Sequence, residues 1–431
     1  MKSMLLKNGR IIDPATKRDE IGDLLIVDGK IAAPVTSHQS PVTTIDCTGL
    51  VIAPGLIDIH VHFREPGQSA KETIASGAKA AAAGGFTSVV CMPNTSPPVD
   101  TPSVVTWILE KARAEACVNI FPTGAITKGL AGEELAPIGS LHKAGVVALT
   151  DDGHCVQSHE IMRRACEYAR MFGLTIMDHC QDYNLVGKGV MHEGRVSAEL
   201  GLPGWPAIGE EIIVVRNALL AEMTGTSIHC QHLSAAGSVR LLREARSRGV
   251  PISGEICPHH IALTDESIRG FDTNFKMNPP LRSQEHVEAL IGGIADGTIT
   301  ILGSDHAPHC GFEKEVEFDF APFGILGLET QLGLFLDILV HKRKAISLPR
   351  LIELYTSNPA KLVGIHSAEK GRRGTLATGA VADVTLINPD LEWTVDKEQT
   401  FSRSRNNPFH GRELKGRAVR TIVGGKTVWA L

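Results

Sequence analysis

Apolar residues in the middle of the chain form short runs that alternate with longer helical patterns. Eight of these runs are typical of buried strands, and between them apolar residues recur every three to four positions. The predicted strands are 56–62, 87–92, 118–124, 146–151, 174–179, 227–233, 251–257 and 298–304. The predicted helices include 71–83, 104–116, 159–171, 210–224, 238–248 and 285–295. Because parallel strands need crossover helices, this order predicts an α/β fold with a (β/α)8 TIM-like barrel.

The two ends of the chain have a different pattern, made of short strand-like pieces without a helical period. In the first fifty residues, the dipeptides Asn8-Gly9 and Asp28-Gly29 predict hairpin turns between these pieces. The last sixty residues contain two further runs, at 382–387 and 419–428. We therefore predict that residues 1–53 and 371–431 join into one small β-sandwich, beside a barrel of residues 54–370.

Composition narrows the class of protein. Apolar residues make up 43% of the 431 positions and charged residues 21%, which are ordinary globular values. The net charge of −5 argues against nucleic acid as a partner. Nine cysteines spread singly, without a CxxC pair, predict reduced thiols and a cytoplasmic protein. We see no apolar stretch of signal-peptide length at the N-terminus and none long enough for a membrane span.

The first predicted barrel strand carries the most informative polar residues. His60 and His62 lie two positions apart, and Arg64 follows two positions later. Alternate residues of a strand point to the same side, so both imidazoles leave one face together. A lone buried histidine is usually a core residue, but two in phase favour a shared metal ion. A fixed cation beside that ion suggests a small anionic substrate.

Polar residues also end most of the other predicted strands, where the active sites of such barrels lie. They are Met92-Pro93-Asn94, Asp151-Asp152-Gly153-His154, Asp178-His179-Cys180, His229-Cys230-Gln231-His232, Cys257-Pro258-His259-His260 and the segment 304–309. Histidines and carboxylates are the ligands of zinc and similar divalent ions. Their gathering at one rim predicts a metal centre.

The number of candidate ligands exceeds the roughly four that one such ion takes. Four histidines are plausible, together with at least two carboxylates: His60, His62, His179, His232, Asp305 and one of Asp151 and Asp152. The set therefore points to two ions that share a bridging group, with hydroxide as the nucleophile. Either Asp151 or Asp152 is placed to bridge. Asp305 is placed as a terminal ligand that also acts as the general base.

The remaining rim residues are expected to have less direct roles. His229 and His232 are three positions apart and not in phase, and we choose His232 because it lies nearer the strand end. Four more histidines are expected to support loops or to hydrogen-bond the ligands: His154, His259, His260 and His306. Cys180 and Cys230 are expected to be buried packing residues.

These motifs together resemble a known family. Residues 54–62, Pro-Gly-Leu-Ile-Asp-Ile-His-Val-His, resemble the signature of the amidohydrolase superfamily. The continuation to residue 67, with the segments 92–95, 276–282 and 303–309, is similar to dihydroorotases of the bacterial class I type. The resemblance runs from the N-terminal strands to the final Gly-Lys-Thr-Val, so it covers essentially the whole chain.

The resemblance implies reversible closure of N-carbamoyl-L-aspartate to L-dihydroorotate and water, a step of de novo pyrimidine biosynthesis. It implies one or two zinc ions and the following ligands: His60, His62, Asp152, His179, His232 and Asp305. Many relatives use a carboxylated lysine as the bridge after the fourth strand, but residues 146–152 contain no lysine. The Asp-Asp-Gly sequence there resembles the branch in which the second aspartate bridges, which assigns Asp152 and not Asp151.

The resemblance also implies substrate contacts at four positions: Arg64, Asn94, Asn278 and His309. A guanidinium suits the carboxylate of dihydroorotate, and an asparagine matches both donors and acceptors of the ring amides. The stretch 320–324 is expected to supply backbone contacts and a lid. A homodimer is expected because two-fold dimers are the commonest oligomers. Aspartate carbamoyltransferase is a candidate partner.

Two alternatives remain open. A sister cyclic-amide hydrolase, of the allantoinase or hydantoinase type, shares the His-x-His strand. Such enzymes usually bridge their ions with the modified lysine and need no arginine at the position of Arg64. An inactive dihydroorotase-like scaffold of aspartate carbamoyltransferase would keep the fold and lose ligands, whereas every ligand position here holds a competent residue.

Overall fold

The computed structural model describes residues 3–33 and 42–431. Residues 1–2 and 34–41, which belong to the predicted sandwich, lie outside the described residues. Eight parallel strands form the predicted barrel, each at or close to its predicted position. They are β6 (Leu56–Val61), β7 (Phe86–Cys91), β8 (Asn119–Pro122), β9 (Ala148–Leu149), β10 (Thr175–Asp178), β13 (Ile228–Cys230), β14 (Ile252–Ile256) and β15 (Ile301–Leu302).

The strands of the barrel form a closed ring. Strands β6, β7 and β8 pair in that order, and β9, β10, β13, β14 and β15 pair in a second run. A parallel bridge between Gly124 and Leu149 joins β8 to β9, and a bridge between Val61 and His306 joins β6 to the residues after β15. The carboxyl ends of all eight strands therefore face one rim.

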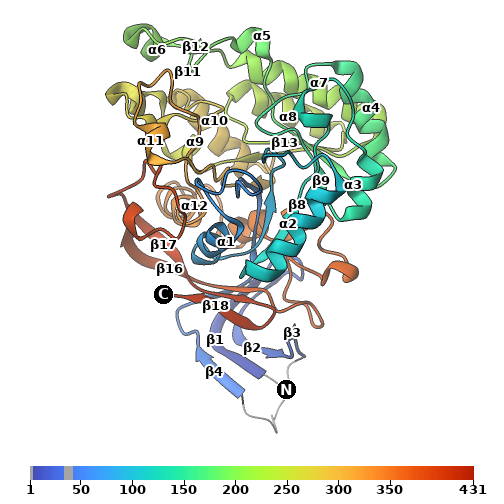
Figure 1. The fold of residues 1–431 in the computed structure, drawn as a ribbon. Helices are drawn as coiled ribbons and strands as arrows, with labels where there is room; N and C mark the ends of the chain where they lie inside the picture. The colour runs from blue at the N-terminus through green and yellow to red at the C-terminus, as the bar shows by residue number, and fades with distance from the viewer. Residues whose placement is uncertain (1–2, 34–41) are drawn as a thin grey trace.

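Helices cover the outside of this ring (Figure 1). The six predicted helices are confirmed, each within three residues of its predicted bounds: α1 (Ile74–Ala83), α2 (Pro102–Glu115), α4 (His159–Arg170), α7 (Ile208–Thr224), α8 (Ala236–Ser247) and α10 (Gln284–Ala295). Further helices follow β8 and β15: α3 (Ile138–Ala144), α12 (Gln331–Phe335), which continues helically through Leu336–Lys342, α13 (Leu348–Tyr355) and α14 (Ser357–Leu362).

Short elements lie in the loops at the carboxyl ends of the strands. Those between β10 and α7 are α5 (Tyr183–Val186), β11 (Met191–His192), α6 (Arg195–Leu200) and β12 (Gly204–Trp205). The others are α9 (His259–Ala262) after β14 and α11 (Gly311–Lys314) after β15. Within the described residues, no helix has the length and apolar character that crossing a membrane requires.

Local sequence explains several helix ends. Thr73 and Ser158 accept hydrogen bonds from backbone N–H groups at the starts of α1 and α4. Gly145 and Gly225 end α3 and α7 with φ values of 114° and 68°, in the left-handed region that glycine adopts without strain.

The two ends of the chain join in one eight-stranded sheet, beside the barrel (Figure 1). Its strands are β1 (Ser3–Asp13), β2 (Arg18–Val27), β3 (Lys30–Ile31), β4 (Val42–Asp46), β5 (Val51–Pro54), β16 (Val384–Thr394), β17 (Glu413–Val423) and β18 (Lys426–Ala430). Leu6 and Ile26 from the first end and Val384 and Ile422 from the last share a core separate from that of the barrel. The β-sandwich predicted from the termini thus has its own core, while its boundaries at 53 and 371 stay predictions.

One predicted turn and one predicted strand-like run at the ends are wrong in detail. Asn8-Gly9 is not a hairpin, because β1 runs through it with a register shift between Leu6 and Gly9, and Asn8 has a φ of 61°. A bulge and a tight turn both place a residue in this conformation, so the dipeptide does not distinguish them. The run 419–428 is not one strand, because Gly424 and Gly425 turn it into the β17–β18 hairpin. Asp28-Gly29 does form its predicted hairpin, between β2 and β3.

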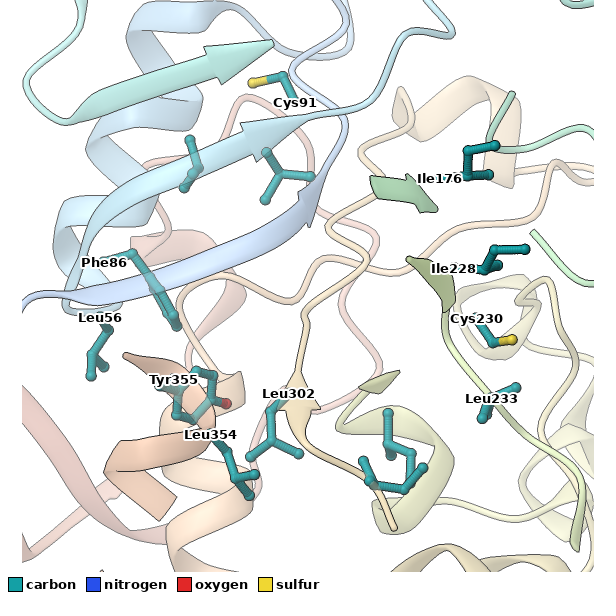
Figure 2. Packing of buried hydrophobic residues seen from close by; sticks show 14 of the residues in the cluster. Leu56, Phe86, Cys91, Ile176, Ile228, Cys230, Leu233, Leu302, Leu354 and Tyr355 are labelled. Carbon is teal, nitrogen blue, oxygen red and sulfur yellow. The ribbon is translucent and has the colours of Figure 1, made fainter. Parts of the chain in front are cut away.

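Apolar side chains fill the space between the barrel strands and their helices. Figure 2 shows Phe86 of β7 beside Tyr355 of α13, and their rings meet edge to face at 5.6 Å. Leu302 and Leu354 are fully buried in the same cluster. This packing between strands and helices holds the strands in place. The polar residues at their carboxyl ends are therefore positioned by a rigid frame.

Candidate active site

Six of the predicted site residues meet at the carboxyl rim of the barrel. They come from the ends of five different strands, and they are His60, His62, Asp152, His179, His232 and Asp305. None of these residues is more than 5% exposed. Their ligand atoms fall into overlapping groups of three, each compact enough to hold a metal ion.

Asp152 lies at the centre of the group. Its Oδ1 is 3.4 Å from His232 Nε2 and 3.5 Å from His179 Nδ1. The same oxygen is 3.4 Å from His60 Nε2, and Oδ2 is 3.3 Å from His62 Nε2. One carboxylate therefore faces two pairs of histidines.

Asp305 completes the side of the cluster that faces the first strand. Its Oδ1 lies 3.0 Å from His62 Nε2 and 3.5 Å from His60 Nε2. Burial alone would raise the pKa of the Asp305 carboxyl, but His60 and His62 hold it well below its usual range. Asp305 and His232 have φ values of 45° and 33°, a conformation that costs free energy in a residue with a side chain.

The spacing and chemistry of these atoms fit a divalent cation. Ligand atoms about 2.1 Å from one tetrahedral ion lie roughly 3.4 Å apart, close to the distances around Asp152. His60 Nε2 and Asp152 Oδ1 are buried and have no hydrogen-bond partner among the described residues. Buried polar atoms are rarely left without a partner, and a bound cation would supply the one that is missing here.

The outer nitrogen of three of the histidines is held by a neighbouring side chain. His60 Nδ1 lies 2.5 Å from Glu255 Oε1, and His62 Nδ1 lies 2.8 Å from Asn94 Oδ1. His179 Nε2 lies 2.8 Å from Gln181 Oε1. Since each outer nitrogen donates to an oxygen, the inner nitrogen is left as a lone pair that can bind a metal.

Two of these supporting residues, Glu255 and Gln181, were missed by the sequence analysis. Burial would raise the pKa of Glu255, but the His60 imidazole and hydrogen bonds from His229 and His60 lower it to about 2. The available signal was one carboxylate inside the apolar strand 251–257, which needs a buried partner.

The sequence analysis also missed that Asp58 supports the site. Its carboxylate accepts the backbone N–H groups of His60 and Ser304 at 3.0 and 3.2 Å, and so ties the first strand to the last.

The structure keeps the other polar rim residues out of the six-residue cluster. Asp151 accepts the backbone N–H groups of Ile126 and Thr127 at 2.7 and 3.0 Å, and burial raises its pKa to about 6. His229 contacts Ser253 and Glu255. Partners of the remaining histidines include Glu72 for His306 and the Pro279 carbonyl for His260. Cys257, His259 and His260 form a separate buried group, and Cys180 and Cys230 are buried.

A cavity of about 310 Å³ lies beside the cluster, and all four predicted substrate contacts line it: Arg64, Asn94, Asn278 and His309. Several of their polar atoms are unused by the described residues. Among the described residues, the Arg64 side chain makes one hydrogen bond, from Nε to the Pro308 carbonyl at 3.3 Å. Asn278 Oδ1 and both ring nitrogens of His309 have no hydrogen-bond partner in the part of the chain that the structure describes. Asn94 differs, because its Oδ1 is already bound to His62.

The charge of this cavity suits an anion. Burial lowers the pKa of Arg64 to about 10, which leaves the guanidinium charged at neutral pH. Burial together with Arg64 and Lys314 lowers the pKa of His309 to about 2, so this imidazole is neutral. The cavity therefore offers one fixed cation and neutral hydrogen-bonding groups beside the cluster of histidines and carboxylates.

Two buried lysines hold the loop that covers the cavity, where Pro322, Phe323 and Gly324 form part of the wall. Lys314 Nζ donates to the Pro322 carbonyl at 2.7 Å, and Lys276 Nζ donates to the Phe318 carbonyl at 2.7 Å. Gly324 has a φ of 149°, and a Cβ there would lie 2.7 Å from His309 Cδ2. Only glycine fits between this loop and the imidazole.

Comparison with known proteins places this chain in a family. A family model described as Dihydro-orotase-like matches residues 49–238, and one described as Amidohydrolase family matches residues 233–429. Proteins named Dihydroorotase from Geobacter sp. (strain M21) and Solibacter usitatus (strain Ellin6076) are 50% and 49% identical to this chain. Both alignments span 99% of this chain, with 99% and 98% of the relatives. The chain belongs to the dihydroorotase family.

Solved structures of hydantoinases and dihydropyrimidinases have the same fold as this chain. The L-hydantoinase (dihydropyrimidinase) from Arthrobacter aurescens superposes with a TM-score of 0.89 at 26% identity, over 100% of this chain and 98% of that one. A dihydropyrimidinase from Brevibacillus agri, at 23% identity and a TM-score of 0.85 over 99% of this chain and 95% of that one, shares the fold. The fold of the barrel and its sandwich is thus common to both groups.

Proposed function

We propose that this chain is a zinc-dependent dihydroorotase that interconverts N-carbamoyl-L-aspartate and L-dihydroorotate in pyrimidine biosynthesis. The observation that carries the proposal is the position of Asp152 between two histidine pairs, beside a cavity that contains Arg64. Identity near 50% to proteins named Dihydroorotase, over almost the whole chain, supports the same reaction.

The proposed ligands are the six clustered residues, with two zinc ions per chain. His60, His62 and Asp305 would hold one ion. His179 and His232 would hold the other, and Asp152 would contribute its carboxylate to both. Zinc bound there would polarise the amide carbonyl of the ring and lower the pKa of a bound water. The imidazole and carboxylate donor set, with its unpartnered lone pairs, supports this assignment.

The cavity residues are proposed to fix the substrate by its charge and its amide groups. The Nη groups of Arg64 would pair with the carboxylate of dihydroorotate in a two-pronged contact. Asn278 and the neutral His309 offer the ring amides both donors and acceptors. Asn94 would contribute its amide N–H while its oxygen holds His62. The loop at Phe323 and Gly324 would close over the ring and exclude water.

Asp305 is the proposed general base. In ring opening it takes a proton from the attacking water and passes it to the departing ring nitrogen. In ring closure the ureido nitrogen attacks a side-chain carboxylate, Asp305 takes the nitrogen proton, and an oxygen leaves as water. Closure removes one carboxylate and consumes one proton, so lower pH favours dihydroorotate. An equilibrium ratio that does not change with pH would contradict this scheme.

A side-by-side rate assay with dihydroorotate, hydantoin and allantoin, together with metal analysis, tests the proposal. We expect dihydroorotate to be preferred and zinc to be present. Faster turnover of hydantoin or allantoin would favour a sister hydrolase. A folded, zinc-free and inactive chain would favour the scaffold for aspartate carbamoyltransferase.

The setting of the enzyme in the cell is also a proposal. All nine cysteines are free, and seven of them are buried, which suits a reducing compartment such as the cytoplasm. A homodimer and a complex with aspartate carbamoyltransferase remain proposed partners. Sedimentation of the purified chain, alone and mixed with the transferase, distinguishes them.

A further inference from the structure

A segment from the C-terminal end of the chain lies against the rim of the barrel. It is residues 402–406, in the connection between β16 and β17, and we call it the strap. Burial alternates along it, because Ser402, Ser404 and Asn406 are only 2–3% exposed, whereas Arg403 is exposed and Arg405 is partly exposed. Buried polar side chains need hydrogen-bond partners. The partners that these three find outside the strap belong to two loops at the carboxyl ends of the barrel strands.

Asn406 joins two stretches of the loop that follows β15. Its Nδ2 donates to the carbonyls of Ala307 and Gly324, at 2.9 and 3.0 Å. Its Oδ1 accepts the backbone N–H of His309 at 3.1 Å, and its own carbonyl accepts the N–H of Leu326 at 3.0 Å. One buried side chain therefore holds residues 307–309 and 324–326 together.

These two stretches form a wall of the cavity beside the histidine cluster, because His309 and Gly324 both line it. The Gly324 backbone packs so closely on the His309 imidazole that a Cβ at Gly324 would lie 2.7 Å from His309 Cδ2. Neither ring nitrogen of His309 has a hydrogen-bond partner among the described residues. The imidazole is therefore placed by its backbone and by the packing of Gly324, and Asn406 holds both.

The other end of the strap holds the loop between β6 and α1, which contains Arg64. The Ser404 hydroxyl donates to the carbonyl of Lys71 at 2.7 Å. The Ser402 hydroxyl donates to the carboxylate of Glu72 in the same loop. The strap thus connects the loop that carries the cavity's arginine to the loop that carries its neutral histidine.

We propose that the strap positions the substrate-binding wall of the cavity and that Asn406 is its main positioning residue. The proposal rests on the function proposed above, since it takes the cavity as the place of dihydroorotate. None of the side-chain hydrogen bonds of Asn406 reaches the six clustered residues. Its loss should therefore weaken substrate binding and leave zinc binding unchanged. An interaction that is equally strong in the bound substrate and the transition state changes KM and not kcat.

Steady-state kinetics of the full, zinc-loaded chain with dihydroorotate test the proposal. Asn406→Ala leaves the N–H of His309 and two carbonyls without their side-chain partner. We expect KM to rise by about 10-fold or more, with kcat within a few fold of the wild type. The matched control is Asn407→Ala, because Asn407 is also buried but accepts, among the described residues, only the N–H of Phe409 at 2.9 Å. Its KM should stay near the wild-type value.

Ser404→Ala is a milder second variant, since it removes a single hydrogen bond from the strap. We expect a rise in KM of about 3-fold, and this variant decides the question if Asn406→Ala does not fold. KM does not depend on the fraction of chains that are folded, so a loss of stability alone leaves it unchanged. A wild-type KM in the strap variants overturns the proposal, and so does an equal rise in Asn407→Ala.

Amide hydrogen exchange tests the strap without any turnover. In Asn406→Ala the N–H of His309 loses its acceptor, and residues 307–309 should exchange about 10-fold faster than in the wild type and in Asn407→Ala. Exchange in strand β10 should not change. Faster exchange in a chain that does not turn over dihydroorotate would uphold the positioning role and reject the proposed reaction. Unchanged exchange at residues 307–309 overturns the inference, whatever the substrate.

Discussion

Asp178 and His179 are neighbours at the end of β10, yet their surroundings differ in kind. The Asp178 carboxylate accepts hydrogen bonds from Arg216 Nη2 at 2.6 Å and from Asn217 Nδ2 at 2.7 Å. Its charge is balanced by a buried cation from α7. His179 Nδ1 instead faces His232 Nε2 at 2.8 Å and Asp152 Oδ1 at 3.5 Å. Around His179, two imidazole nitrogens and a carboxylate oxygen approach one another, and the described residues place no cation between them.

The contrast separates a polar cluster that supports the fold from one that binds a ligand. Both clusters are buried, both lie at the rim of the barrel, and both contain carboxylates. In the first, every charged atom has a partner in the chain, and the cluster joins β10 to α7. In the second, unpartnered atoms such as His60 Nε2 indicate the place of a ligand. Substitutions in the first should change stability, and substitutions in the second should change chemistry.

The largest effect is expected for Asp305→Asn. A carboxamide can still lie beside His62 but cannot accept and return a proton, so kcat should fall by about 10³-fold or more. Metal content and the unfolding midpoint should stay close to the wild type. The measurement is kcat with dihydroorotate, accompanied by zinc analysis of the purified variant.

Asp151→Asn is the matched control, because Asp151 is equally buried but bonded to the backbone of Ile126 and Thr127. We expect kcat within a few fold of the wild type. Near-normal kcat in Asp305→Asn would remove that residue from the role of base. An equal loss of kcat in both variants would mean that hydrogen-bond partners within the chain do not distinguish a catalytic carboxylate from a structural one.

The next effect is on stability, for Arg216→Met. This change leaves the Asp178 carboxylate buried without its cation, which should lower the free energy of unfolding by about 3–5 kcal/mol. The double variant Asp178→Asn with Arg216→Met removes the unpaired charge and should recover much of the loss. Urea unfolding measures both, and kcat per folded molecule should stay near the wild-type value. A large fall in kcat without a fall in stability would place Asp178 with the chemical cluster.

Much of this fold follows from local pattern. The eight strands and the six helices were predictable because their apolar periods are long and the barrel rule places the strand ends together. The meeting of four histidines with one of two adjacent aspartates was predictable for the same reason. Asp151 was harder to exclude from the residues alone, because two adjacent aspartates at a strand end look alike until their hydrogen bonds are seen. The family resemblance made that choice.

Other features depend on contacts between distant residues and left little local signal. Glu255 holds His60 across 195 positions of the chain. The short elements between β10 and α7 have too few residues for a period to show. Asn8-Gly9 forms a bulge and not a turn because β1 pairs with β2 on both sides of it. The lysines under the loop, Lys276 and Lys314, were not predicted either, since lysine is normally exposed.

A smaller effect is expected for Glu255→Gln, which tests whether the supporting carboxylate belongs to the chemical cluster. The amide keeps the shape of the side chain but loses the charge that holds His60 Nδ1. Loss of such a supporting partner typically weakens metal binding by about 10–100-fold. Competition with a chelator measures the zinc affinity. Unchanged affinity would assign Glu255 to the fold alone, together with Asp178.

The smallest effect concerns Lys314, a buried cation that contrasts with Arg216. Arg216 is paired with a carboxylate, whereas Lys314 donates only to carbonyl oxygens, among them those of Thr273 and Pro322. Burial and the nearby Lys276 lower the pKa of Lys314 to about 7, although Asp272 and Glu313 oppose the shift. An unfolded lysine keeps its proton to about pH 10. Between these values the unfolded chain binds more protons, so stability should rise with pH.

The slope due to this group is at most about 1.4 kcal/mol per pH unit. Lys314→Met lacks it, so between about pH 7.5 and 8.5 the wild type should gain roughly 1 kcal/mol of unfolding free energy relative to the variant. Urea unfolding at the two pH values measures this difference. Equal slopes of unfolding free energy against pH would mean that Lys314 stays protonated when folded. Its hydrogen bonds to carbonyl oxygens would then be enough to hold the charge. In that case the absence of a carboxylate would not distinguish Lys314 from Arg216, and partner charge would matter less in this barrel than the number of hydrogen bonds.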